Sequence, residues 1–505
     1  MARIQIGRNE YESWPPDDQQ SKQRLENYQR SRLLFKGKHH DVFPRIQQWL
    51  ERQADQELIY IVCNFAGLLS KVSADMLFGE PPRFFCEKAE ENSPEQEALD
   101  NLVKDNKLST LNYEMALSAS WRGEAIYKAR FGKFRDWSDK EHAIIEAASP
   151  GIFWPILDGD NVHGMMGGVF GWVKDGPGGT SKKYLRIERQ LPGRIENELY
   201  FLDGQKIGDR VKLSIFPEYA GMEDEQETKY PGLLFEVVPN WRLDDEFWGI
   251  NDYFDLEGLF DEMNNRVSRI SRVLDKHESP KLILPPGIMK EDPDNPGRWY
   301  VDKEDLELLE VDPSTENVGD LPKYLTWDAQ LDSGFKQIEK LMELAFILSE
   351  TSPDAFGLGK SGQAESGRAL KFRLIRLLSK INRKKLYYDE GLKNIMYAAQ
   401  YLNAQHSDGP EPQDVRIEWK DGLPEDPYES AQVEQIRTGN RATSSVRSAV
   451  RRLDGATGQE LEDELAEIEK DGVTDRTGGA EEPGINLPKL GAALGDTGGI
   501  AGGGE

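Results

Sequence analysis

The feature that most constrains the fold is a pair of amphipathic helical segments that enclose a short insert rich in proline and glycine. Residues 251–277 and 329–350 place apolar side chains three and four positions apart, as one face of an α-helix requires. Such a face is stable only when it is covered, so we expect these helices to pack against other helices. The candidate interface residues are Leu256, Leu259, Phe260, Met263, Val267, Ile270 and Leu274 in the first segment and Phe335, Ile338, Leu341, Met342 and Leu348 in the second.

The insert between the two helices, residues 281–327, contains three candidate strands. They are "KLILPPG", "RWYVD" and "LELLEVD", and proline and glycine separate them. The order is therefore helix, small β insert, helix and then a glycine-rich loop.

The rest of the chain divides by its local patterns. Residues 19–122 have mainly helical spacing, including a continuous helix over "LIYIVCNFAGLLSKVSADML". Residues 124–241 form short runs of β-branched and aromatic residues between turn signals, which predicts a β-rich section. Beyond the glycine loop we expect a long helix over 366–403, a strand at "DVRIEWK", helices over 428–437 and 443–469, and a disordered glycine-rich tail. A chain of 505 residues has room for two to four domains.

The glycine loop, "GLGKSG" at 357–362, contains fragments of two nucleotide-binding signatures. A P-loop requires glycine five positions before its Gly-Lys pair, and this chain has Asp354 there. Both nucleotide motifs also follow a strand, whereas the segment that enters this loop has helical periodicity. We therefore interpret the loop as a mobile connection between helices, with nucleotide binding as the less favoured alternative.

A cluster of basic residues follows the loop. Between 368 and 385 the chain has eight lysines and arginines and no acidic residue. Two interpretations remain open: pairing with carboxylates of a neighbouring subunit, which we favour, or contact with DNA. The residues that share one helical face form the basic stripe: Arg373, Arg376, Lys380, Arg383 and Lys384.

Composition excludes several classes of function. A net charge of −27 argues against a protein that grips nucleic-acid phosphates over most of its surface. The cysteines, Cys63 and Cys86, and six histidines show no metal-ligand spacing, so we expect no metal and no cofactor. The start of the chain has no signal-peptide pattern, and the longest apolar run, residues 58–70, is too short for a membrane span.

Several segments, in this order, resemble the portal proteins of tailed bacteriophages of the siphophage, long-chain type. They are "NFAGLLSKVSADMLFGEPP", "GLFDEMNNRVSRISRVLDKHESPKLIL", "SGRALKFRLIRLLSKINRKKLYYDEGL" and "VRIEWKDGLPEDPYESAQ", followed by an acidic C-terminal helix. Together they cover about residues 64–470. The resemblance implies an α+β portal fold that assembles into a ring, usually of twelve subunits, around a DNA channel.

The resemblance also implies a division of the chain into the regions of a portal subunit. The glycine loop falls where the family has a tunnel loop, whose DNA-facing residues would be Asp354, Phe356, Gly357, Leu358, Gly359 and Lys360. The implied regions are the wing at 1–250, stem helix 1 at 251–277, the clip at 278–328, stem helix 2 at 329–350, the tunnel loop at 351–365, a wing helix and strand at 366–427, the crown at 428–470 and the tail at 471–505.

The function implied by this resemblance is structural rather than enzymatic. A portal ring sits at one capsid vertex of the virion, is assembled in the bacterial cytoplasm, and lets double-stranded DNA pass during packaging and ejection. The implied partners are other copies of the chain, terminase and then head-completion or adaptor proteins at the clip, and major capsid and scaffolding proteins at the wing, with no membrane. The alternatives are a terminase-type ATPase and nuclease, or a non-portal structural protein of the virion.

Overall fold

The computed structural model divides the chain into two compact units, residues 1–424 and 425–505, and each is described by itself. The fold is mixed α and β, which confirms the predicted α+β class. The described residues are 3–45, 60–88, 93–133, 141–278, 281–283, 290–293, 295–300, 323–325, 331–358, 367–407, 409–420, 422, 427–439, 442–454 and 459–477.

The N-terminal part of the first unit is helical, as predicted, but one expected helix starts later than its pattern indicates. Residues 60–64 are not helical, and α3 begins only after Asn64, whose side chain accepts a hydrogen bond from the backbone N–H of Gly67. Side chains of the helix α6 (Glu257–Glu278) satisfy the backbone here instead, because the backbone N–H of Cys63 donates to the side-chain oxygen of Asn264. The helices are α1 (Gln19–Phe35), α3 (Phe65–Phe78), α4 (Pro94–Asp105) and α5 (Leu108–Arg122), preceded by the hairpin of β1 (Ile4–Ile6) and β2 (Asn9–Tyr11).

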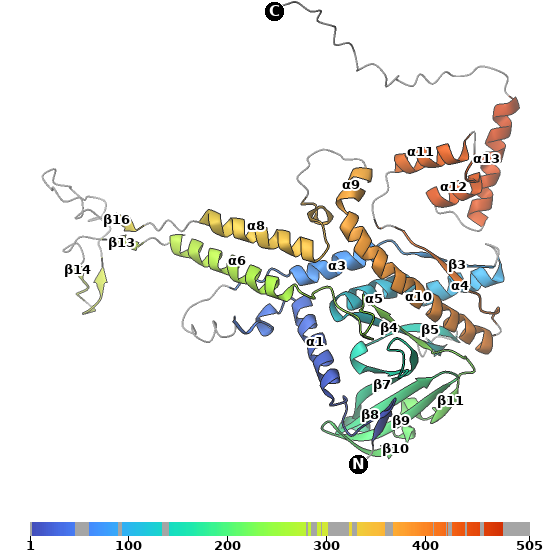
Figure 1. The fold of residues 1–505 in the computed structure, drawn as a ribbon, viewed down its shortest axis with the longest axis horizontal. Coiled ribbons are helices and arrows are strands. Elements are labelled where there is room, and N and C mark those ends of the chain that lie inside the picture. Colours follow the sequence, from blue (N-terminus) through green and yellow to red (C-terminus); the bar gives the residue numbers. More distant parts are fainter. Residues whose placement is uncertain are drawn as a thin grey trace, which may run out of the picture. The chain divides into compact units, whose positions relative to one another are not determined.

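The β-rich section predicted for 124–241 is confirmed and forms two antiparallel sheets (Figure 1). One sheet has the order β10-β9-β8-β7-β6, with β11 also paired to β9, and the other has the order β12-β4-β5. The short strands β6, β10 and β11 were not predicted from the sequence. The strands are β4 (Glu124–Lys133), β5 (Glu141–Ala148), β6 (Phe153–Leu157), β7 (Met165–Gly176), β8 (Thr180–Leu191), β9 (Arg194–Asp203), β10 (Lys206–Val211), β11 (Glu225–Glu227) and β12 (Phe235–Pro239).

The outer edge of β5 is covered by side-chain amides rather than by another strand of the described chain. Asn106 donates to the carbonyl of Ala143 and accepts from the N–H of Ile145, at 3.0 and 2.7 Å. Asn403 accepts from the N–H of Ala143 at 2.6 Å. Backbone groups at this edge therefore have partners within the chain.

The long helix predicted after the glycine loop is interrupted near its start. It consists of α9 (Gly367–Arg373) and α10 (Ile375–His406), separated at Leu374. The helix α10 packs across β4, β5 and β12, and Gly391 allows the close approach because a Cβ there would lie 2.4 Å from Val238. The predicted strand is β17 (Val415–Glu418), and it pairs with β3 (Arg83–Cys86).

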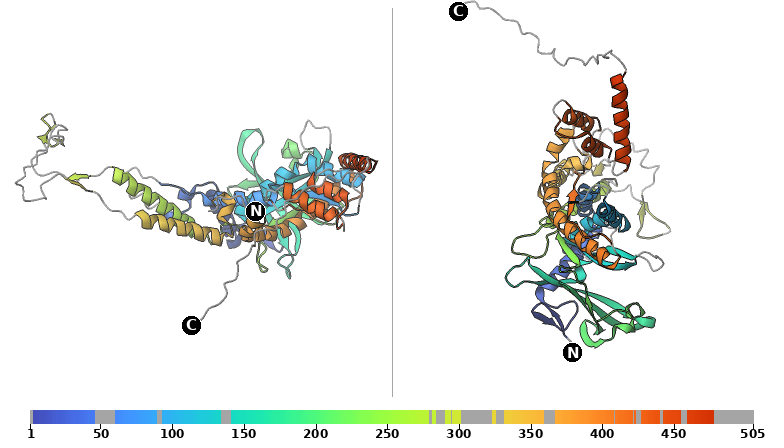
Figure 2. Two further views of the ribbon diagram at one scale, coloured as in Figure 1. Left: turned by 90° about the horizontal axis from the view of Figure 1, so that it is seen from above. Right: turned by 90° about the vertical axis from the view of Figure 1, so that its right-hand side faces the viewer.

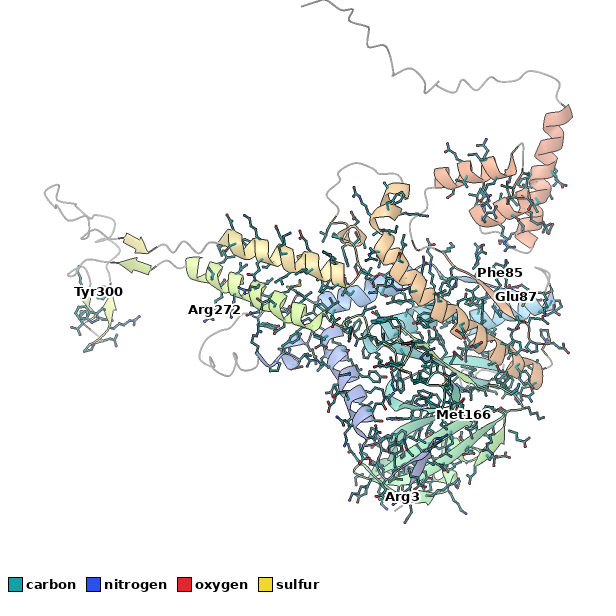
Figure 3. The ribbon with its side chains drawn as sticks, viewed as in Figure 1. Arg3, Phe85, Glu87, Met166, Arg272 and Tyr300 are labelled. Atoms are coloured by element: carbon teal, nitrogen blue, oxygen red, sulfur yellow. The ribbon has the colours of Figure 1, made fainter. Side chains whose placement is uncertain are left out.

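The two amphipathic segments form α6 (Glu257–Glu278) and α8 (Leu331–Leu348), which lie side by side (Figures 1 and 2). Figure 3 shows Arg272 on α6 outside the crowded side chains of the sheets. Between these helices the described strands are β13 (Lys281–Ile283) with β16 (Lys323–Leu325), and β14 (Lys290–Glu291) with β15 (Trp299–Tyr300). The third predicted strand, "LELLEVD", lies outside the described residues.

The described part of the second unit contains three helices where the sequence predicted two. They are α11 (Pro427–Thr438), α12 (Val446–Leu453) and α13 (Gln459–Thr477). The guanidinium of Arg452 pairs with the carboxylate of Glu434 at 2.7 Å, which joins α12 to α11. The helix α13 extends to Thr477, into the segment predicted to be disordered, and residues 478–505 lie outside the described part.

Candidate functional site at the base of the helix pair

The inner ends of α6 and α8 are embedded in a hydrophobic core of the first unit. Leu256, directly before α6, and Phe260 and Met263 of α6 pack there with Ala345 and Phe346 of α8, and all five side chains are buried. This core also includes residues of α1, α3 and α5. The base of the helix pair is therefore held by the chain's own side chains.

The predicted interface residues consequently occupy different environments. Leu259, Leu341 and Met342 are half-buried against the same core, and Val267, Ile270 and Ile338 are half-buried farther along the pair. Leu274, Phe335 and Leu348 are 45%, 47% and 54% exposed. The fully buried residues, Leu256, Phe260 and Met263, are thus not available to a neighbouring subunit in this conformation, because the body of the same chain covers them.

The helix α8 also has a second apolar face, which the sequence analysis did not separate from the first. Leu344, Ile347 and Leu348, spaced three and four apart, are 46%, 70% and 54% exposed. The face toward the core contains Leu341, Ala345 and Phe346. Two apolar faces on one helix indicate contacts on two sides.

The chain leaves α8 through a short ordered turn before the glycine loop. Ser352 caps the 3₁₀ turn Pro353–Phe356 by accepting from the N–H of Asp354, and Gly357 has a left-handed backbone with φ of 70°. The ring of Phe356 lies 5.5 Å from that of Phe346, and it packs against the core of the helix pair. The entry to the loop is therefore anchored to the body of the chain.

This geometry changes the interpretation of the predicted tunnel-loop residues. Phe356 packs inward, and the carboxylate of Asp354 pairs with Arg373 of α9 at 3.3 Å, so both side chains have contacts within the same chain. Leu358 is 56% exposed. Gly359 and Lys360 lie outside the described residues. The predicted helical entry is confirmed, because the segment before the turn is α8 and not the strand that nucleotide motifs require.

The basic stripe does not form one exposed face, which corrects the prediction made for it. Lys380 and Lys384 are buried, so they contact neither DNA nor a neighbouring subunit in this conformation. Arg373 and Arg383 are exposed but pair within the chain, Arg373 with Asp354 and Arg383 with Glu350 at 2.5 Å. Arg376 is exposed.

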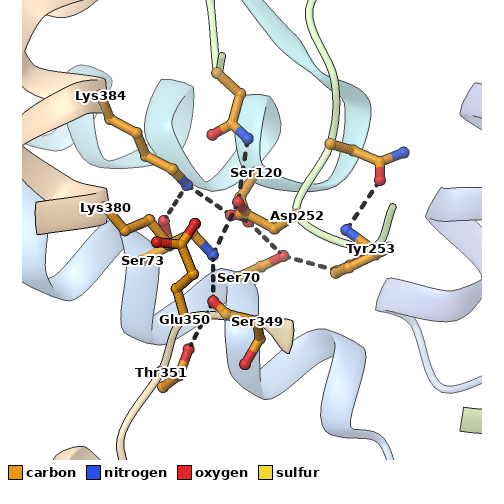
Figure 4. Close-up of polar contacts among 12 residues, drawn as sticks. Ser70, Ser73, Ser120, Asp252, Tyr253, Ser349, Glu350, Thr351, Lys380 and Lys384 are labelled. Atoms are coloured by element: carbon orange, nitrogen blue, oxygen red, sulfur yellow. Dashed lines mark hydrogen bonds and ion pairs between the residues drawn. The ribbon is translucent and has the colours of Figure 1, made fainter. Parts of the chain in front are cut away.

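The two buried lysines converge on Asp252, a residue that the sequence analysis did not single out (Figure 4). The Lys380 and Lys384 ammonium groups lie 3.1 and 2.6 Å from its carboxylate oxygens, and Ser120 donates to it at 2.6 Å. Hydroxyl groups extend the cluster, since Ser70 lies 2.9 Å from Ser120 and 2.7 Å from the Tyr253 hydroxyl. The cluster joins α10, α5 and α3 to the segment that leads into α6.

The electrostatics of the cluster follow from two ammonium groups that share one carboxylate. Burial alone would raise the pKa of Asp252, but attraction to Lys380 and Lys384 outweighs burial and holds that pKa well below its usual range. Burial lowers the pKa of Lys384 to about 8. Attraction to Asp252 opposes this decrease, and repulsion from Lys380 and Arg383 adds to it. Breaking such a buried pair leaves an uncompensated charge, which is strongly destabilising.

A signal for this cluster was present in the sequence. Lys380 and Lys384 share a helical face with Leu377, Ile381 and Tyr388, which are all buried. Basic residues that interrupt an apolar stripe require a buried partner. The sequence did not identify Asp252 as that partner, because Asp252 lies more than a hundred positions away.

Other kinds of site find little support in the described part of the chain. No group of three or more histidine, cysteine, aspartate or glutamate residues there could hold a metal ion. Among the described helices, none is both long enough and apolar enough to cross a membrane.

Two solved structures resemble the chain at low similarity. "Neck of empty GTA particle computed with C6 symmetry" has 12% identity and a TM-score of 0.40, and "Virion of native gene transfer agent (GTA) particle" has 10% identity and a TM-score of 0.37. Each alignment covers 78% of this chain and 90% of the solved chain. No curated protein matches the chain. Because both TM-scores are low, the family assignment depends on sequence.

The sequence match to a known family covers more than half of the chain. Residues 196–473 match the family described as "Phage portal protein, SPP1 Gp6-like". The match includes α6, the insert, α8, the glycine loop and α10. It excludes the two alternatives, a terminase-type enzyme and a non-portal virion protein. The chain therefore belongs to the phage portal protein family, whose members are structural, non-enzymatic components of the virion.

Proposed function

We propose that this chain assembles into a ring of twelve copies at one capsid vertex, and that double-stranded DNA passes through the ring during packaging and ejection. The observation that carries the proposal is the family match over residues 196–473. In this proposal α6 and α8 are the stem, residues 278–328 the clip, 1–250 with 366–427 the wing, and 428–470 the crown. Terminase and then adaptor proteins dock at the clip, and capsid and scaffolding proteins contact the wing.

The second apolar face of α8 supports the ring. Leu344, Ile347 and Leu348 are exposed in the single chain, and a ring with head-to-tail contacts would cover such a face with the next subunit. The more distal Leu274 and Phe335 are also exposed and remain candidates for the same interface. We therefore propose that these exposed residues, rather than the buried ones at the base, form the stem interface between subunits.

The pairing of the basic stripe within the chain supports DNA passage without retention. Arg373 and Arg383 have carboxylate partners, and Lys380 and Lys384 are buried. A duplex that moves past would have to break each phosphate contact it made with a free cation. We place residues 351–365 beside the duplex, with Leu358 as the described side chain that extends from the anchored turn.

The experiment begins with electron microscopy of the purified protein, for which we expect rings with an axial hole. It then compares Leu358→Lys with Leu358→Gln in proheads, measuring packaged DNA per prohead. Because Leu358 is exposed, both variants should form rings. Leu358→Lys should package more slowly, and the defect should be greater at low salt because the new attraction is screened at high salt.

Two outcomes would contradict parts of the proposal. Monomers at high concentration would contradict the ring. Normal packaging by Leu358→Lys at low salt would place residues 351–365 away from the DNA.

Gly357→Pro is a poor probe of the loop, because proline cannot adopt the φ of 70° found at Gly357.

A further inference from the structure

The two buried lysines of the Asp252 cluster differ in what else they contact. Lys384 donates to the hydroxyl of Ser73 in α3, at 2.5 Å. Lys380 donates instead to the backbone carbonyl of Ser349, at 3.1 Å, directly after the end of α8 (Figure 4). Lys384 thus links α10 to the body of the unit, whereas Lys380 links α10 to the segment that leads into the glycine loop.

Charge balance alone does not require both lysines. A single ammonium group would neutralise Asp252, and the second adds a buried positive charge that must be stabilised. The carbonyl of Ser349 supplies part of that stabilisation, because a carbonyl at the C-terminal end of a helix lacks an intrahelical partner and attracts a cation. The presence of Lys380 beside Lys384 is therefore best explained by its hydrogen bond to the carbonyl of Ser349.

The segment held by Lys380 has an unusual backbone. Glu350 has a φ of 54°, in the left-handed region that residues other than glycine seldom adopt. Its carboxylate is paired with Arg383, one helical turn after Lys380 on α10. Lys380 therefore contacts the carbonyl of Ser349 from within the core, whereas Arg383 adds only an exposed ion pair to the next residue.

We propose that Asp252, Lys380 and Ser349 form a latch that sets the position of residues 349–358, with Lys380 as its positioning residue. The latch couples the end of α8 to α10, so a displacement of either element is transmitted to the entry of the glycine loop. Its role in DNA passage depends on the function proposed above. Its existence does not depend on that function.

Two single variants separate the latch from a general structural role. Lys380→Met leaves Asp252 paired with Lys384, and Lys384→Met leaves it paired with Lys380, so each variant retains one neutral buried ion pair. They differ in that only Lys380→Met removes the bond to Ser349. Amide hydrogen exchange of the full chain, read by mass spectrometry, measures local opening in each.

We expect Lys380→Met to speed exchange in residues 349–358 about tenfold, with α3 unchanged. Lys384→Met should instead speed exchange in α3 and leave 349–358 at the wild-type rate. Arg383→Met, which removes only an exposed ion pair to the same segment, is the matched control and should change exchange there less than twofold. Equal exchange of 349–358 in Lys380→Met and Lys384→Met would overturn the latch.

A measurement on the wild-type chain keeps the test decisive even where a lysine variant does not fold. In native-state exchange with low denaturant, residues 349–358 should open together with residues 377–388 of α10. Opening of residues 349–358 at a lower denaturant concentration than residues 377–388 would also overturn the latch.

Packaging distinguishes failure of the latch from failure of the proposed function. Faster exchange in 349–358 with normal packaging by Lys380→Met would support the latch and contradict the role proposed for the loop. Faster exchange with reduced packaging, in rings of normal size, would support both.

Discussion

The two ends of the α6–α8 pair have similar amphipathic sequences but opposite surroundings. At the inner end, Phe260, Met263 and Phe346 are buried in the core of the chain, next to the charged cluster of Asp252. Farther out, Leu274 and Phe335 remain about half exposed. An amphipathic pattern predicts that a face will be covered, but it does not indicate whether the same chain or another copy provides the cover.

The largest effect on the stability of the subunit should come from a charge placed at the inner end. Met263→Asp would bury a carboxylate without a partner and should lower the free energy of unfolding by at least about 3 kcal/mol. Soluble yield and thermal unfolding measure the effect, and Leu274→Asp on the same helix is the control. Wild-type unfolding of Met263→Asp would mean that the inner end is open.

The charged cluster of the inner end should give the next largest effect, as a dependence on pH. The pKa of Lys384 is lowered to about 8 from 10.5, so the unfolded chain binds more protons between these values. Stability contributed by this group therefore rises as pH increases from 8 to 10.5, by about 3 kcal/mol in total. Denaturant unfolding at several pH values should show a flatter profile for Lys384→Met, and parallel profiles would contradict the assigned shift.

The outer face of α8 should respond in assembly rather than in folding. Ile347→Asp places a charge on a side chain that is 70% exposed, so unfolding of the isolated subunit should change by less than about 0.5 kcal/mol. In the ring the same charge would be buried between subunits, so mass measurements should show loss of the ring. Ile347→Val keeps this face apolar, so it is the control and should assemble normally. Intact rings from Ile347→Asp would exclude this face from the interface.

The smallest effect should come from trimming an outer aromatic residue. Phe335→Ala removes a ring that is 47% exposed and should cost the isolated subunit less than about 0.5 kcal/mol. Phe346→Ala, on the same helix but 6% exposed, should cost about 3–5 kcal/mol. Urea unfolding of both variants measures these free-energy costs. Similar costs for the two variants would contradict the contrast between the inner and outer ends.

The sequence predicted regular elements well because they depend on local spacing. The β-rich section, α6 and α8 agree with their patterns within a few residues, and α9 with α10 cover the long predicted helix apart from the break at Leu374. The exception at residues 60–64 is instructive: the segment is apolar enough for a helix, but its backbone bonds to Ser268 and Asn264 of α6. Those partners come from a distant part of the chain, which local periodicity does not register.

The candidate site was less accessible to sequence reasoning because it depends on which distant charges meet. The basic stripe was recognised, and its carboxylate partners were expected in a neighbouring subunit. The partners found are Asp252, Glu350 and Asp354 of the same chain. An exposed and a buried lysine look alike in a sequence. The informative sign was their position between buried residues of one helical face.

The amides of Asn106 and Asn403 along β5 have a consequence for how copies of this chain can join. An uncovered strand edge accepts another strand by backbone pairing, which is indifferent to side chains and can continue without limit into fibrils. At β5 the backbone groups of Ala143 and Ile145 already have partners. Extension of the sheet from chain to chain through β5 is therefore disfavoured, so this edge offers copies of the chain no route to open-ended pairing.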